Sequence, residues 1–289
     1  MKLLVTGRHG QLARSLAERS GEHPELQVDF VGRPEVDLCV PGSLAATIGA
    51  RRPDVVINAA AYTEVDKAEA EPELARRINA DAAGEAAGAA AAVGAAIVQV
   101  STDYVFDGQL DRPYREDDPV GPINVYGATK AAGEDKVRSA NPRHLILRTS
   151  WVVSPFGRNF VRTMIEAART RDRLTVVDDQ RGRPTSALDL ADAILSLAEG
   201  GGERSGTYHL AAAGEASWFD LANAVMDECR SLGAPAAAVE PIRTADWPTA
   251  AARPANSVLD CSRIADELGI RLPDWKGSVR QIVRRIGAA

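Results

Sequence analysis

Tyr126 and Lys130 are the residues of this sequence whose types and spacing best suit proton transfer. Residues four apart on a helix lie one turn apart on the same face, so the lysine ammonium can stabilise a phenolate. The free pKa of tyrosine is about 10, and lowering it to roughly 7 requires about 4 kcal/mol of differential stabilisation. A tyrosine adjusted in this way can donate or accept a proton. The same spacing also occurs in helices where the tyrosine packs and the lysine is solvated, so neighbouring features must decide.

Ser101, Thr102 and Asp103 follow the apolar segment 95–100, which is predicted to be a buried strand. Open α/β sheets bind ligands at the carboxyl ends of their strands. Hydroxyls at such a place can also serve only as a turn or a helix cap. A helix that begins some twenty residues later would return beside this strand end and bring Tyr126 close to Thr102. The segment 107–124 between them contains three prolines and is predicted to be an irregular loop that could cover a substrate.

A glycine turn near the N-terminus is the next candidate site. Residues 2–6 are predicted to be a strand, and the apolar periodicity from Leu12 onward predicts a helix. Between them, Gly7, Gly10 and Ala13 form a pattern of small residues like that of dinucleotide-binding turns. Glycines allow a tight turn and close backbone approach, and free N–H groups at a helix start attract pyrophosphate. A plain strand-to-helix turn is the alternative interpretation.

Arg33 follows a second predicted strand, 27–31. The end of this strand in dinucleotide folds meets the adenosine ribose, where an acid binds the 2′-hydroxyl and an arginine accommodates a 2′-phosphate. Arg33 therefore favours NADPH, and the absence of a neighbouring acid leaves NADH usable but poorer. The alternative is an arginine solvated in a loop.

The remaining segments predict an α/β protein with a parallel sheet. Residues 53–61 form an apolar run ending in small residues, as expected of a central strand buried on both faces. A long alanine-rich helix is predicted over 72–93. Beyond Trp151 the predicted helices span 160–168, 188–198, 218–232, 262–268 and 278–286, and the predicted strands span 174–177 and 206–210.

Length and composition limit the possible domain organisation and the possible classes of binding partner. At 289 residues, we expect a Rossmann-type domain over 1–150 and a smaller substrate-binding lobe over 151–289, with some elements of the second part completing the main sheet. A net charge of −6 without a basic block argues against nucleic acid. No apolar run approaches the roughly 20 residues that span a bilayer, and the N-terminal run is cut too early for a signal peptide. We therefore expect a cytoplasmic protein.

The cysteines and histidines do not form a metal-binding pattern. Cys39, Cys229 and Cys261 are far apart and are expected to be reduced and structural. The four histidines are equally scattered, so neither a zinc site nor a Ser/His/Asp triad is expected.

A series of motifs in a fixed order resembles the dTDP-4-dehydrorhamnose reductase family of extended short-chain dehydrogenases. These motifs are Gly10-Gln11-Leu12, Asn58 to Thr63, Val65 to Glu69, Ser101 to Gly108, Asn124 to Gly127 and Arg148 to Trp151. The resemblance continues through Asp179-Gln180, Gly182 to Thr185, Arg253 to Ser257 and Leu272 to Trp275.

The resemblance implies a doubly wound α/β fold and NADPH-dependent reduction of the C4 keto group of a dTDP-4-dehydro-6-deoxysugar, with dTDP-4-dehydro-L-rhamnose as the leading substrate. It implies Tyr126 as the acid, Lys130 as the residue that lowers its pKa and holds the ribose, and Thr102 as a partner of the reacting oxygen. The expected cofactor-binding residues are Gly7, Gly10, Gln11, Leu12, Arg33, Asp37, Leu38, Ala61, Tyr62, Thr63, Tyr126 and Lys130. The expected substrate-binding residues are Thr102, Asp103, Phe106, Tyr126, Trp151 and Arg253.

Two rival functions and the assembly stay open. A nucleotide-sugar epimerase would use the same tyrosine and lysine but retain its NAD, and a dinucleotide-binding regulatory subunit would not need Thr102, Tyr126 and Lys130 together. Some members of the resembling family are understood to dimerise through a metal bound partly by an acid on the first helix. Ser15 stands at that position here, so no structural metal is expected, and the chain is expected to be a monomer or a homodimer.

Overall fold

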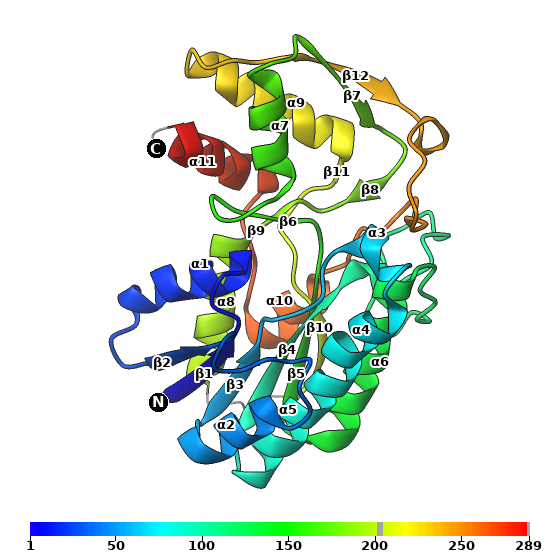
Figure 1. The fold of residues 1–289 in the computed structure, drawn as a ribbon. Coiled ribbons are helices and arrows are strands. Elements are labelled where there is room, and N and C mark those ends of the chain that lie inside the picture. The colour runs from blue at the N-terminus through cyan, green and yellow to red at the C-terminus, as the bar shows by residue number, and fades with distance from the viewer. Residues whose placement is uncertain (201–204, 288–289) are drawn as a thin grey trace.

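The computed structural model describes residues 1–200 and 205–287. Its larger lobe is built on one six-stranded sheet in the order β10-β5-β4-β3-β1-β2, and all neighbouring strands are parallel. The strands are β1 (Lys2–Thr6), β2 (Gln27–Val31), β3 (Val55–Asn58), β4 (Ala96–Thr102), β5 (His144–Thr149) and β10 (Gly206–His209). The fold is thus the expected doubly wound parallel sheet (Figure 1).

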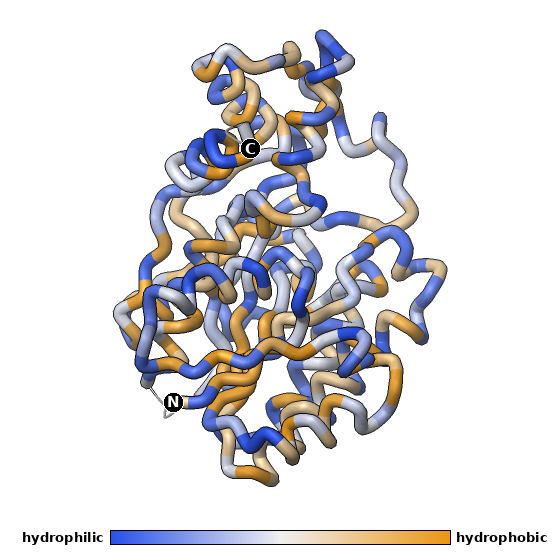
Figure 2. Tube along the Cα trace, turned by 60° about the vertical axis from the view of Figure 1, so that its left-hand side comes forward, coloured by the Kyte–Doolittle hydropathy of each residue, from blue (hydrophilic) through white to orange (hydrophobic). Residues whose placement is uncertain are grey.

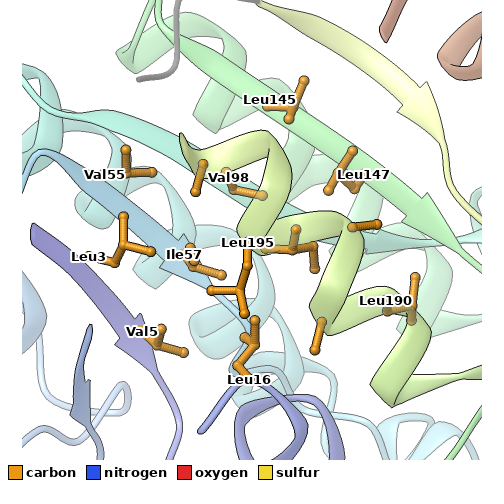
Figure 3. Packing of buried hydrophobic residues seen from close by; sticks show 14 of the residues in the cluster. Leu3, Val5, Leu16, Val55, Ile57, Val98, Leu145, Leu147, Leu190 and Leu195 are labelled. Atoms are coloured by element: carbon orange, nitrogen blue, oxygen red, sulfur yellow. The ribbon is translucent and has the colours of Figure 1, made fainter. Parts of the chain in front are cut away.

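Helices cover both faces of this sheet. On one face lie α1 (Gln11–Arg19) and α8 (Ala187–Glu199), and on the other lie α2 (Ser43–Arg51), α5 (Ala82–Ala92) and α6 (Val125–Ala140). Alternate strand residues serve the two faces: Leu3 and Val5 pack under α8, whereas Leu4 packs under α2 and α5. Figure 3 shows Leu190 and Leu195 of α8 lying over the strands.

Burial on both faces explains the apolar strands. Val5, Val56 and Ile57 have no exposed surface, and burying such a side chain contributes roughly 1.5–3 kcal/mol. Hydrophobic segments accordingly gather along the central strands, and polar segments lie mostly in the periphery (Figure 2).

The strand order places a crevice between β1 and β3. The chain passes from β1 outward to β2 and then returns across β1 to β3. Ligands of doubly wound sheets bind where the winding direction changes, outside the carboxyl ends of the strands. The glycine turn after β1 and the small residues after β3 therefore adjoin the same crevice.

A smaller lobe stands above the carboxyl ends of the strands (Figure 1). It has its own hydrophobic core, which includes Val161, Leu221, Trp275 and Ile282. Its elements are β6 (Val152–Val153), α7 (Phe160–Ala168), β7 (Arg173–Val177), β8 (Arg181–Gly182), β9 (Thr185–Ser186), β11 (Ala216–Ser217), α9 (Trp218–Ser231), β12 (Ala238–Ile242), η4 (Thr244–Asp246) and α11 (Trp275–Gly287). In contrast, α8, β10 and α10 (Ser262–Leu268) pack with the large sheet although they follow residue 150.

The helix predicted over 72–93 is divided in the structure. It consists of α4 (Pro72–Arg76), a π-helical turn η2 (Arg77–Asp81) and α5. Asn79 lies in the π turn, and its side chain accepts from the Tyr62 N–H at 2.8 Å and donates to Thr129 at 3.1 Å. The prediction of one regular helix was wrong because these tertiary bonds impose a wider turn on an otherwise helical sequence.

Other elements also differ from the sequence predictions. The strand predicted over 53–61 is confined to β3, since the chain leaves the sheet after Asn58. Helix α2, strand β12 and the short α3 (Val65–Ala68), η1 (Ser20–Glu22) and η3 (Asp103–Val105) were not predicted. β12 contains Pro241 and pairs only with β7, an edge position that tolerates proline.

A buried ion pair ties α6 to the sheet. Glu134 of α6 and Arg148 of β5 are 2% and 3% exposed, and their closest nitrogen and oxygen are 2.7 Å apart. Ser101 of β4 donates to the same carboxylate at 2.5 Å. Three elements are thus fastened at one point behind the strand ends.

We expect Arg148→Met to lower the free energy of unfolding by about 3–5 kcal/mol, because it leaves the Glu134 carboxylate buried without its cation. Urea denaturation followed by circular dichroism measures the change. The matched control is Arg173→Ala, which removes an exposed pair with Glu240 and should cost about 0–1 kcal/mol. The double variant Arg148→Met/Glu134→Gln should be more stable than Arg148→Met alone, and equal losses for Arg148→Met and the control would contradict the prediction.

Candidate active site

Thr102 and Tyr126 meet at the carboxyl end of β4. Thr102 is the last residue of β4, and Tyr126 lies in the first turn of α6. The Thr102 hydroxyl lowers the pKa of the Tyr126 phenol, so the two side chains lie close together and the two segments converge. The ring of Tyr104 stands edge-on to the Tyr126 ring, with 6.1 Å between centroids.

Gly127 allows α6 to come this close. A Cβ added at Gly127 would lie 2.1 Å from the carbonyl oxygen of Tyr104, a distance that no side chain can occupy. Asn124 begins the helix and accepts a hydrogen bond from the Gly127 N–H at 2.7 Å, the usual geometry of an N-cap. The first turn of α6 therefore rests with its backbone against η3, and this contact places the Tyr126 hydroxyl beside Thr102.

Burial dominates the ionisation of Tyr126. It raises the pKa of this tyrosine to about 12, the Thr102 hydroxyl acts in the lowering direction, and the nearby Asp103 carboxylate raises the pKa further. Lys130 does not contribute to this shift. The expected lowering of the Tyr126 pKa by Lys130 therefore stays a prediction for the enzyme with its cofactor bound, and Thr102 is the group that acts in the lowering direction in this structure.

Lys130 is buried one turn after Tyr126. Its ammonium donates to the carbonyl oxygen of Val100 at 2.6 Å. Burial lowers the pKa of Lys130 to about 8, and the Glu134 carboxylate one turn further along α6 opposes that effect. The ammonium is thus directed at the β4 backbone.

Asp103 and Phe106 were expected in the sugar site, and the structure contradicts both expectations. Asp103 is 2% exposed, and its carboxylate accepts hydrogen bonds from hydroxyls of the protein itself. Phe106 has no exposed surface and stacks on Tyr114 at a centroid distance of 4.3 Å. The η3 turn breaks the alternation of a strand, so both side chains point into the core.

Trp151 bridges the two lobes. Its ring stacks on that of Trp218, with centroids 3.6 Å apart and planes 6° from parallel. Its backbone has a φ of 46°, a left-handed conformation that is strained for a large side chain. Its indole nitrogen is buried and has no hydrogen-bond acceptor among the residues that the structure describes.

Arg253 is placed by an ion pair. Its guanidinium contacts both carboxylate oxygens of Asp66 on α3, at 2.6 and 2.9 Å. Arg253 also interacts electrostatically with Tyr104. This arginine therefore stands next to the tyrosine pair with its charge already compensated.

The glycine turn after β1 suits a pyrophosphate. Gly7 has a φ of 94°, and Gly10 precedes α1 without any side chain capping the first N–H groups. No acid lies in the first turn of this helix. The backbone donors of Gln11 and Leu12 are thus available at a positive helix end, although the Leu12 side chain packs in the core.

The Gln11 side chain connects this turn to the second lobe. Its amide oxygen accepts from the Ser154 hydroxyl at 2.9 Å, and its amide nitrogen lies 3.4 Å from the Val152 carbonyl oxygen. On the other side of the crevice, Ala60 donates to Thr6 at 3.1 Å, and Ala61 follows it. Tyr62 is mostly buried and donates to Glu71 at 2.7 Å, whereas Thr63 is exposed.

The loop after β2 carries more charge than was predicted. Arg33 is exposed there, as expected. Arg8 was missed: its guanidinium reaches the Phe30 carbonyl oxygen at 3.0 Å and Glu35 at 2.6 Å. Glu35 is an acid close to Arg33 in sequence, and both Arg8 and Arg51 compensate its charge.

Residues 37–39 continue the loop after β2. Asp37 accepts from the Cys39 N–H at 2.9 Å, and Leu38 packs partly against the core. Cys39 is exposed, so its expected structural role is wrong, whereas Cys229 is buried and Cys261 is half-buried. None of the three is in a disulfide.

The chain matches the family model described as RmlD substrate binding domain over residues 1–287. The chain belongs to this family. A dTDP-4-dehydrorhamnose reductase of Sinorhizobium fredii is 44% identical over 288 residues, covering 98% of this chain and 97% of that protein. These matches confirm the resemblance that the motifs indicated.

Solved structures of the same kind are similar throughout. A dTDP-4-dehydrorhamnose reductase of Clostridium acetobutylicum has a TM-score of 0.93 at 38% identity, covering 99% of this chain and all of that chain. One from Bacillus anthracis, solved in complex with NADP, has a TM-score of 0.91 at 34% identity, covering 97% and 98% of the two chains.

Several residues that support the site were not predicted from the sequence. Trp218, Arg8 and Asn79 each contact a predicted site residue or its neighbour, but they come from different parts of the chain. Asn124 alone carried a local signal, because an asparagine three residues before a glycine at a helix start is typical of an N-cap.

We expect Gly127→Ala to lower turnover by at least about 10²-fold, because the added methyl group must push the first turn of α6 away from η3 and displace the Tyr126 hydroxyl. Steady-state kinetics with NADPH and a dTDP-4-keto-6-deoxysugar measures the loss.

Gly88→Ala is the matched control for this change. Gly88 lies in α5, and nothing is within 4 Å of a Cβ added there. Alanine is about 1 kcal/mol more favourable than glycine in a helix, so the control should keep its turnover and gain stability. Equal turnover in the two variants would show that the contact with η3 does not position Tyr126.

Proposed function

We propose that this protein reduces the C4 keto group of a dTDP-4-dehydro-6-deoxysugar with NADPH, and that its substrate is dTDP-4-dehydro-L-rhamnose and its product dTDP-L-rhamnose. The observation that carries the proposal is the placement of Thr102 beside Tyr126 at the end of β4, in a chain 44% identical to a dTDP-4-dehydrorhamnose reductase over nearly its whole length. A half-buried phenol next to a hydroxyl, with a buried ammonium one helical turn away, suits protonation of an alkoxide.

Tyr126 is the proton donor of this proposal. A pKa of about 12 keeps the phenol protonated at neutral pH, so it is ready to act as a general acid. NADPH, when bound, supplies the hydride. Thr102 hydrogen-bonds the reacting oxygen, and Tyr126 gives its proton to the alkoxide that forms at C4 of the sugar.

Lys130 holds the nicotinamide ribose. Its ammonium lies at the β4 backbone, and a ribose hydroxyl of bound NADPH would offer it a further acceptor. Such a contact would favour the charged form of Lys130, which burial disfavours, and the charged lysine would stabilise the Tyr126 phenolate.

The remaining cofactor contacts follow the crevice between β1 and β3. The N–H groups of Gly10, Gln11 and Leu12 would bind the pyrophosphate, and Gly7 would let it approach the backbone. Arg33 binds the 2′-phosphate. Asp37, Leu38, Ala61, Tyr62 and Thr63, which lie on either side of the crevice, would hold the adenosine part of the cofactor.

Trp151 and Arg253 form the substrate side of the site. The ring of Trp151, held by its stacking on Trp218, offers an apolar face to the sugar. Arg253 lies near the tyrosine pair and suits a phosphate oxygen of the nucleotide. Asp103 and Phe106 are excluded from direct contact by their burial.

The two rival functions have less support. Thr102, Tyr126 and Lys130 are all buried or half-buried at one strand end, which a regulatory dinucleotide-binding subunit does not require. A nucleotide-sugar epimerase would keep its NAD bound and give no net oxidation of added NADPH.

The proposal extends to the setting of the enzyme. Residues 1–150 mainly bind the cofactor and residues 151–289 mainly bind the sugar. The cysteines of the described residues are all unpaired, which suits the cytoplasm, and within that part of the chain no helix is both long and apolar enough to cross a bilayer. Its partner is a nucleotide sugar rather than nucleic acid or membrane, and it works as a monomer or a homodimer without a structural metal.

Incubation with NADPH and a panel of dTDP-4-keto-6-deoxysugars tests the function. We expect stoichiometric oxidation of NADPH with dTDP-4-dehydro-L-rhamnose and formation of dTDP-L-rhamnose, identified by NMR. Conversion of a nucleotide sugar without NADPH oxidation would instead support the epimerase.

We expect Tyr126→Phe to lower turnover by about 10²- to 10⁴-fold, since the general acid is lost while the ring still packs. NADPH affinity, measured by fluorescence titration, should change little. Tyr208→Phe is the control, because it removes a buried phenol that donates to Glu267 in another part of the lobe. Near-normal turnover in Tyr126→Phe would refute the role of Tyr126.

We expect Arg33→Ala to weaken NADPH binding by about ten- to a hundredfold and to leave NADH binding nearly unchanged, because only NADPH carries the 2′-phosphate. The NADPH advantage of the wild type should shrink as salt rises, since the contact is exposed. Calorimetric titration of both cofactors measures this. Arg171→Ala, at another exposed arginine, is the control, and equal losses for the two cofactors would reduce Arg33 to a solvated loop residue.

A further inference from the structure

Asp103 has an unusual environment for an acid next to a proton donor. Its carboxylate accepts hydrogen bonds from the hydroxyls of Thr102 and Ser150, both at 3.0 Å. The Ser257 hydroxyl, which donates to the Arg181 carbonyl oxygen at 3.3 Å, also lowers the pKa of Asp103. Asp103 and Ser257 are 2% and 1% exposed. A carboxylate enclosed in this way cannot contact the sugar, so any effect on the reaction must pass through one of these hydroxyls.

Few charges surround this carboxylate. The groups that face it are the phenols of Tyr104 on η3 and Tyr126 on α6, with Arg253 and its partner Asp66 behind Tyr104. No lysine, arginine or histidine of the described residues forms an ion pair with Asp103, whereas its burial is nearly complete. Burial raises the pKa of Asp103 to about 6, and the three hydroxyls act in the opposite direction. The group therefore changes its protonation state close to neutral pH.

The hydroxyl of Thr102 has a single proton to share. Its oxygen already accepts the Tyr104 N–H at 3.2 Å. When Asp103 is ionised, the Thr102 proton points at the carboxylate, so Thr102 can only accept from Tyr126. When Asp103 is protonated, its own O–H can donate to Thr102, and the threonine proton is free to point at Tyr126 or at a substrate oxygen.

We propose that Asp103 is a positioning residue whose protonation sets the direction of the Thr102 hydroxyl, so that the protonated acid makes Thr102 a donor toward the reacting oxygen and the carboxylate withdraws that donor. This proposal rests on the proposed function, because it needs Thr102 and Tyr126 to act on the keto group. No covalent step is involved, and the proton on Asp103 exchanges with solvent between turnovers.

The test is the pH dependence of the single-turnover rate of NADPH oxidation with dTDP-4-dehydro-L-rhamnose, from pH 5 to 9. In the wild type we expect the rate to fall by about tenfold, to a lower plateau, as pH rises through the pKa of Asp103. This size corresponds to the loss of one good hydrogen bond to the reacting oxygen.

Asp103→Asn should remove this pH dependence, because its amide N–H₂ can donate to Thr102 at every pH as the protonated acid does. Thr102→Val should be slow, and its rate should show no such step. The double variant Thr102→Val/Asp103→Asn should behave like Thr102→Val alone, because Asp103 acts only through the threonine.

Ser257→Ala keeps the test decisive if Asp103→Asn fails to fold. This change removes a hydroxyl that favours the carboxylate, so the step should remain and move to higher pH. Ser205→Ala, at an exposed serine bonded to backbone oxygens of Pro142 and His144, is the control and should not move it.

Three results with Asp103→Asn would overturn the proposal. The first is a pH step in the rate that persists in this variant, and the second is a rate lowered by the same factor at every pH. The third is a raised KM for the sugar at unchanged turnover, which would indicate that Asp103 contacts the sugar directly. The wild-type reaction itself tests the proposed function independently of Asp103. A wild type without NADPH oxidation at any pH would refute the proposed function itself, whereas reduction without the predicted step would refute only the role of Asp103.

Discussion

The buried contact of Glu134 with Arg148 and Ser101 is the constraint on which the site depends. Charges with this little exposure are retained only when their partners are held in good geometry, since an unpaired ion in the interior is costly. The contact therefore fixes α6 relative to β4 and β5. Tyr126 and Lys130 lie eight and four residues before Glu134 on the same helix, so the position of the proton donor follows from this anchor.

The opposite end of α6 is fixed by shape rather than charge. Gly127 lets the helix backbone reach the Tyr104 carbonyl, and Thr129 near it receives a hydrogen bond from Asn79 in the π turn. The same asparagine binds the backbone of Tyr62 on the cofactor side of the crevice. One polar side chain thus couples the loop after β3 to the helix that carries the proton donor, which explains why a regular helix is interrupted there.

Local patterns predicted the scaffold and the proton-transfer pair well. The periodicity of apolar residues gave the parallel strands and most helices, and the spacing of Tyr126 and Lys130 with the Ser101-Thr102 strand end predicted their convergence. These signals work because each depends on residues close in sequence or on the common edge of a parallel sheet.

The errors arose where contacts join distant segments or where a turn redirects side chains. Asp103 and Phe106 follow Thr102 directly, but η3 turns both inward, and no alternation rule applies to such a turn. The partner of Arg253 is 187 residues away, and Trp218 stacks on Trp151 across the two lobes. The balance of burial against hydrogen bonding that sets the pKa of Tyr126 depends on three-dimensional neighbours that spacing does not reveal.

Transfer of deuterium from the cofactor tests the central claim most directly. The protein is incubated with NADPH that carries two deuterium atoms at nicotinamide C4 and with dTDP-4-dehydro-L-rhamnose, and the product is analysed by NMR and mass spectrometry. A reductase with the proposed site gives dTDP-L-rhamnose with one deuterium at C4 of the sugar, in a one-to-one ratio with the NADP⁺ formed. An unlabelled product, a label at another carbon, or conversion without loss of NADPH would contradict the account.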